Sequence, residues 1–141
     1  GGFSVLMPGP KDPVERVSRT ETSNVGPYTT HLFIQGSTSG SFLVGWTDYA
    51  SGVNFNKRAE MEANRDNLVK QLKGTISSSK WFTFNGSEAL EFAAVAEGRA
   101  IRARVYMVGN RPYMTIAMSN PGVDDSVNVT RFLDSFKFIG R

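Results

Sequence analysis

The 141-residue chain contains no cysteine and a single histidine, His31. A protein without cysteine has no disulfide bond, no thiolate nucleophile and no cysteine-ligated metal. A single histidine also excludes sites in which two histidines hold zinc. The sequence has neither a glycine-rich phosphate loop nor a G-x-S-x-G serine motif. We therefore expect no metal, no cofactor and no catalytic residue set.

Long hydrophobic runs are absent as well. No apolar stretch approaches the ~20 residues that a helix needs to cross a bilayer, so no transmembrane segment is expected. The hydrophobic fraction of 40% and the charged fraction of 21% are those of an ordinary folded domain. A length of 141 residues suits one core, and we expect one domain over residues 1–141.

The excess of positive charge is small, at +3 from 16 basic and 13 acidic residues. It is unevenly distributed, because residues 99–141 are basic whereas residues 74–98 are acidic. Nucleic-acid-binding domains show denser basic clusters in recognisable modules. The sequence thus predicts no nucleic-acid partner.

The clearest pattern present is strict alternation over residues 99–118, interrupted by Gly109-Asn110. Such alternation around a two-residue turn predicts a β-hairpin. One face of its first strand carries four apolar side chains that we expect to be buried: Ile101, Ala103, Val105 and Met107. The opposite face carries Arg102, Arg104 and Tyr106.

Other strands are predicted over residues 3–7, 14–23, 28–35, 41–49, 76–84 and 88–96. Residues 57–73 lack glycine and proline and predict a long helix that ends at Gly74. Asp124-Asp125 is a candidate cap for a second helix, whose apolar stripe ends at Phe136. The pattern predicts an α+β fold with a mostly antiparallel sheet of six to eight strands.

Two sets of residues are candidates for binding. Arg102, Arg104 and Tyr106 share a face that could hold a carboxylate, a phosphate or an acidic protein surface. The alternative is a solubilising face whose arginines pair with Glu91 or Glu97 on the preceding strand.

The second set would line an aromatic pocket: His31, Trp46, Asp48, Tyr49, Trp81 and Phe84. A half-exposed strand histidine is the alternative for His31, and a turn-forming aspartate the alternative for Asp48. A cavity of several hundred cubic ångströms between the long helix and the sheet would favour the pocket.

Four segments together resemble the PsbP/Mog1-like superfamily: FSVLMPGP (3–10), FLVGWTDY (42–49), RVYMVGNRPYMTI (104–116) and RFLDSFKF (131–138). The resemblance implies an α/β/α sandwich, in which helices flank both faces of the antiparallel sheet. Its members include extrinsic photosystem II subunits, a Ran-binding nuclear protein, and bacterial secreted or lipid-anchored proteins. It supplies no catalytic motif for these positions.

These observations favour a non-catalytic binding or accessory domain, not an enzyme, that engages a protein partner or a small ligand. The resemblance implies a bacterial periplasmic or extracellular location. Because Gly1-Gly2 leads into a strand without an initiator Met, we expect a removed signal segment or an upstream lipid anchor. The alternatives are a cystatin- or NTF2-like small-molecule-binding or enzymatic domain, and a purely structural assembly domain.

Overall fold

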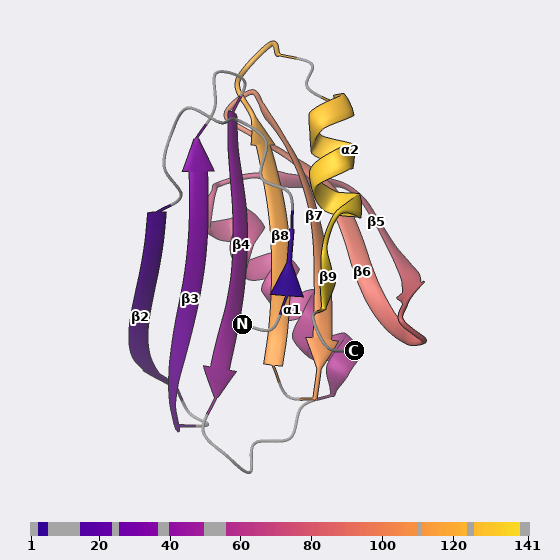
Figure 1. Cartoon of the computed structure of the whole chain (residues 1–141). Helices are drawn as coiled ribbons and strands as arrows, with labels where there is room; N and C mark the ends of the chain where they lie inside the picture. The colour runs from indigo at the N-terminus through magenta and orange to yellow at the C-terminus, as the bar shows by residue number, and fades with distance from the viewer. Residues whose placement is uncertain are drawn as a thin grey trace.

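The computed structural model describes residues 3–5, 15–23, 26–36, 40–49, 56–109, 111–123 and 126–138. These residues form a seven-stranded antiparallel sheet with the order β2-β3-β4-β8-β7-β6-β5, and a two-stranded sheet β1-β9 (Figure 1). The strands of the large sheet are β2 (Glu15–Ser23), β3 (Gly26–Gly36), β4 (Gly40–Tyr49), β5 (Thr75–Phe84), β6 (Ser87–Ala96), β7 (Arg99–Val108) and β8 (Arg111–Ser119). The remaining elements are β1 (Phe3–Ser4), β9 (Lys137–Phe138), α1 (Lys57–Gln71) and α2 (Ser126–Asp134). The predicted α+β class and antiparallel sheet are confirmed.

Two tight turns set the register of the C-terminal strands. Asn85 and Gly86 connect β5 to β6 with φ angles of 52° and 77°, and Glu97 and Gly98 connect β6 to β7 with 51° and 78°. Two successive positive φ angles match the right-handed twist of the strands that a hairpin joins. The predicted hairpin over residues 99–118 is confirmed as β7 and β8, although Asn110 of its turn lies outside the described residues.

Helix α1 has defined ends. The Asn56 side chain accepts a hydrogen bond from the backbone N–H of Ala59 at 3.0 Å, which satisfies a free donor of the first turn. The Gly74 N–H donates to the Val69 carbonyl at 2.9 Å, so the helix ends two residues before the predicted Lys73. The predicted cap of α2 at Asp124-Asp125 lies outside the described residues.

The two helices contribute to different hydrophobic clusters. Met61 and Val69 of α1 belong to a cluster with the predicted apolar face of β7, which is buried as expected. Val129, Phe132 and Leu133 of α2 belong to a second cluster with β4 and β8. Figure 1 draws α1 behind the sheet and α2, β1 and β9 in front of it. Neither described helix is long and apolar enough to cross a membrane.

The small sheet β1-β9 attaches both ends of the described chain to the large sheet through aromatic rings. The Phe136 ring stacks on Tyr106 with centroids 4.7 Å apart and an interplanar angle of 8°. Phe3 lies 5.4 Å from Phe136 and 5.3 Å from Trp46. Offset and edge-to-face ring pairs add to the energy of burial, so this aromatic layer stabilises the front of the sheet.

Candidate functional site

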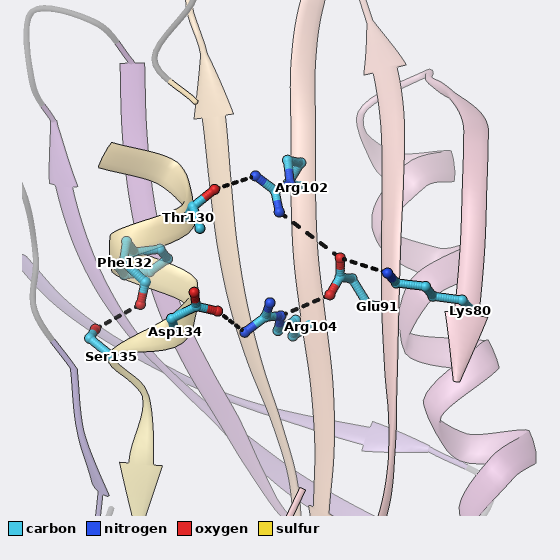
Figure 2. Close-up of polar contacts among 8 residues, drawn as sticks. All are labelled: Lys80, Glu91, Arg102, Arg104, Thr130, Phe132, Asp134 and Ser135. Carbon is cyan, nitrogen blue, oxygen red and sulfur yellow. Dashed lines mark hydrogen bonds and ion pairs between the residues drawn. The ribbon is translucent and has the colours of Figure 1, made fainter. Parts of the chain in front are cut away.

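The predicted binding face of β7 takes part in packing inside the protein. Arg104 donates through Nε to Glu91 Oε2 at 3.0 Å and through Nη1 to Asp134 Oδ1 at 2.8 Å (Figure 2). Arg102 donates to Thr130 Oγ1 at 2.9 Å and lies 4.0 Å from Glu91 Oε1. These contacts join α2 to β7 and β6.

Arg104 is the less accessible of the two arginines, with side-chain exposure of 16% against 34% for Arg102. Partial burial alone would lower the pKa of Arg104, but the carboxylates of Asp134 and Glu91 outweigh it and raise the pKa, so the guanidinium stays charged. Arg104 pairs with Glu91, which is the alternative that the sequence left open. We conclude that Arg104 positions α2 and is not available to an external ligand.

Tyr106 lies in the core, with only 2% of its surface exposed. Its hydroxyl has no hydrogen-bond partner within the part of the chain that the structure describes. Burial raises the pKa of Tyr106 to about 12, although the charge of Arg104 acts in the opposite direction. The third member of the predicted binding face is therefore a core residue.

Replacing Tyr106 with phenylalanine should change stability by less than about 1 kcal/mol, because the buried hydroxyl makes no well-aligned hydrogen bond within the described part of the chain. The free energy of unfolding of the wild type should also fall as the pH rises from 10.0, the ordinary pKa of tyrosine, to about 12. In this range the unfolded chain has already released the phenolic proton that the folded protein keeps. Urea unfolding at pH 7 and pH 11 measures both effects. A clear loss of stability in Tyr106→Phe at pH 7 would show that the hydroxyl is satisfied.

The six residues of the predicted aromatic pocket lie in three places. His31, Trp46 and Asp48 are together on the front face of β3 and β4, where the His31 and Trp46 rings stack at 4.8 Å. Tyr49 donates to Glu60 of α1, and Trp81 lies under the Arg58 guanidinium. Phe84 packs on Tyr106. The structure does not bring all six into one pocket.

The group around His31 extends into a row across four strands. Ser18 Oγ lies 3.0 Å from His31 Nδ1, and His31 Nε2 lies 3.1 Å from Asp48 Oδ2. Arg111 Nη2 lies 2.6 Å from Asp48 Oδ1, and its Nη1 donates to the Tyr113 hydroxyl at 3.2 Å. We call Ser18, His31, Asp48 and Arg111 the polar row. Their strands β2, β3, β4 and β8 are neighbours in the sheet.

Each member of the polar row is held and partly accessible. The side chains of His31, Asp48 and Arg111 are 29%, 38% and 42% exposed. The hydrogen bond to Tyr113, together with the charge of Asp48, raises the pKa of the Arg111 guanidinium. Asp48 lies within β4, where it contacts His31 of β3 and Arg111 of β8 and does not form a turn. The row thus presents a fixed order of hydroxyl, imidazole, carboxylate and guanidinium to its surroundings.

Sequence reasoning placed Trp46 and Asp48 on one face but missed Ser18 and Arg111. Alternation does predict which face of a strand each residue occupies. Which residues lie opposite each other depends on the pairing of β2 with β3 and of β4 with β8, and the second pairing joins distant segments. A charged residue directly after the Gly109-Asn110 turn was the available signal for Arg111.

A separate hollow of about 420 Å³ opens near the first turn of α1, at the ends of β5 and β7. We call it the aromatic hollow. It is lined by Lys57, Phe84, Asn85, Ser87, Glu88, Ala89, Tyr106, Met107, Val108, Gly109 and Phe138. Phe84 is the one predicted pocket residue among them. Its size falls within the range of about 300–1,000 Å³ that is usual for small-ligand sites.

Among the described residues, no group of three or more histidine, aspartate or glutamate side chains is arranged to hold a metal ion. No protein-family model matches the chain, and neither a curated protein nor a solved structure does so.

Proposed function

We propose that this protein is a non-catalytic binding domain that recognises a protein partner through the polar row. The observation that supports the proposal is the continuous set of contacts from Ser18 through His31 and Asp48 to Arg111. Partner groups would meet donors and acceptors whose positions are already fixed. Preorganised groups bind more tightly because fewer rotamers are lost on association.

The surroundings of the polar row favour recognition over internal support. Arg104 and Arg102 contact Asp134 and Thr130 of α2, respectively. The hydrogen bonds and ion pairs described for the polar row, in contrast, run between β2, β3, β4 and β8 and involve no helix side chain. The buried Trp46 ring stacks on the His31 ring and restricts its orientation. The row combines one carboxylate with one guanidinium, which suits a partner surface of mixed charge.

The order hydroxyl, imidazole and carboxylate is also that of a serine hydrolase triad. In such a triad the carboxylate stabilises the imidazolium that forms when the serine loses its proton. Here Asp48 also pairs with Arg111 at 2.6 Å, so its charge is already largely compensated. This competition favours a binding role over acyl transfer.

Asp48→Asn and Arg111→Gln should each lower the affinity for the partner about 10-fold or more. Each substitution leaves a fixed charge in the interface without its counterpart. Stability should change by less than about 1 kcal/mol, as for other accessible ion pairs. The partner is captured from cell-envelope extract, identified by mass spectrometry, purified and titrated by calorimetry.

The matched control is Asp66→Asn, which removes an exposed carboxylate paired with Arg65 on α1. Equal affinity of Asp48→Asn, Asp66→Asn and the wild type would place the interface elsewhere. Hydrolysis of p-nitrophenyl acetate that disappears in Ser18→Ala would overturn the non-catalytic part of the proposal.

We also propose that the architecture is a PsbP/Mog1-like α/β/α sandwich and that the domain works outside the bacterial cytoplasm as a secreted or lipid-anchored protein. Support comes from the resemblance of four segments and from the separate clusters to which α1 and α2 belong. The full-length gene tests the location, since we expect it to encode a signal peptide or a lipobox.

A second candidate function is the binding of a small molecule. The aromatic hollow favours it, because Lys57 of the long helix and the ends of the sheet strands line an open depression of about 420 Å³. This site is separate from the polar row, so the two functions can be tested independently.

A further inference from the structure

We propose that the aromatic hollow binds a small amphipathic carboxylate, with its apolar body against the rings and its anionic head on Lys57. The inference rests on the second candidate function, small-molecule binding, and assigns its ligand class. It is independent of the polar row.

Three rings line the hollow, of which Phe84 and Phe138 are half-buried and Tyr106 is almost wholly buried behind them. Phe84 lies 4.6 Å from Tyr106 and 5.8 Å from Phe138, and Tyr106 lies 6.3 Å from Phe138. Phe138 meets both of the others edge to face, at 71° and 85°. Rings held by several such contacts are already ordered. They therefore lose little further conformational entropy when a flat or aliphatic ligand packs against them.

Counted over the described residues, the charges at the hollow sum to one cation without an ion-pair partner. Arg58 donates to both oxygens of Glu88, at 2.7 and 2.8 Å. This contact lowers the pKa of Glu88, so its carboxylate stays ionised and paired. Lys57 also lines the hollow, and it has no ion-pair partner among the residues that the structure describes. A ligand with a negative head group would supply that partner.

The position of Lys57 is unfavourable for the helix itself. It is the first residue of α1, where the backbone N–H groups carry partial positive charge and favour acidic side chains. A residue that opposes local stability without a compensating contact is typical of a functional position. The same residue lines the hollow, and both observations favour an anionic ligand.

The test uses 2-naphthoate with its neutral analogue 2-naphthalenemethanol and its cationic analogue 2-naphthylmethylammonium. Titrations are followed by ¹H–¹⁵N NMR of the whole 141-residue chain. Naphthoate should bind about fivefold or more tightly than the alcohol, as a charge-assisted contact implies. The ammonium analogue should bind most weakly. The amide shifts should gather at Lys57, Phe84, Val108 and Phe138.

Lys57→Gln should reduce naphthoate affinity about fivefold without changing that of the alcohol. Its melting temperature should rise by about 1–2 °C, because a cation leaves the helix start. Lys70→Gln removes the same charge from the last turn of the same helix and should leave affinity unchanged.

Two results would overturn the inference in distinguishable ways. Equal binding of naphthoate and the alcohol, or an unchanged affinity in Lys57→Gln, would remove the anionic ligand class but keep small-molecule binding. Failure of all three probes to shift amides around the hollow would remove the second candidate function together with the ligand class.

Discussion

Arg104→Ala is expected to lower the free energy of unfolding by about 2–3 kcal/mol. The substitution leaves Glu91, whose side chain is only 18% exposed, without its close guanidinium partner. Arg102 and Lys80 remain 4.0 Å from the other carboxylate oxygen, which is too far for a hydrogen bond, so the partly buried Oε2 loses its donor. The loss stays below the 3–5 kcal/mol that is typical of fully buried pairs, because Asp134 is 58% exposed and regains water.

Urea unfolding of Arg104→Ala, Glu91→Ala and the double variant measures the coupling between the two side chains. The double variant should be more stable than the sum of the single losses predicts. Arg102→Ala, with a more accessible side chain on the same strand, should cost less than about 1 kcal/mol. If Arg104→Ala is as stable as Arg102→Ala, α2 does not depend on this network and the β7 face is again a candidate surface.

Phe136→Ala should destabilise the protein by about 3–5 kcal/mol, the range for removing a buried aromatic ring. Phe136 is 2% exposed and connects the ring of Tyr106 with those of Phe3 and Phe138. Its removal leaves a void beneath β1 and β9 that rigid neighbouring rings cannot fill. The wall of the aromatic hollow should loosen at the same time.

Thermal unfolding and near-ultraviolet circular dichroism measure this effect, because the aromatic signal reports ring packing. Phe136→Leu should recover part of the loss. Val127→Ala, on the 79% exposed Val127 of α2, should change stability by less than about 0.5 kcal/mol. A Phe136→Ala variant with wild-type melting and an unchanged aromatic spectrum would contradict the role assigned to the ring.

Strands, turns and the main helix could be predicted because their signals are local. Alternation identified β7 and β8, and the absence of glycine and proline between residues 57 and 73 identified α1. The dipeptide Asn85-Gly86, a combination typical of hairpin turns, forms a turn with positive φ angles. Such features depend on neighbouring residues, and a sequence carries them directly.

The surroundings of the candidate binding residues could not be predicted in the same way, because they depend on distant segments. Arg102 and Arg104 alternate with apolar residues and therefore resemble a solvent-facing surface. Thr130 and Asp134 of α2 nevertheless reach them from some 30 residues further along. The aromatic hollow combines Lys57, Phe84 and Phe138, which are likewise far apart in the chain.

The strand order determines when during folding the polar row is completed. Five of the six pairings in the large sheet join strands that follow each other in sequence, and only β4 with β8 does not. Closing that seam requires the longest loop, which makes it the natural late step of folding. Asp48 and Arg111 face each other across the seam. Nascent or partly folded chains would therefore lack a complete polar row. A partner that binds the row would bind only chains that have completed folding.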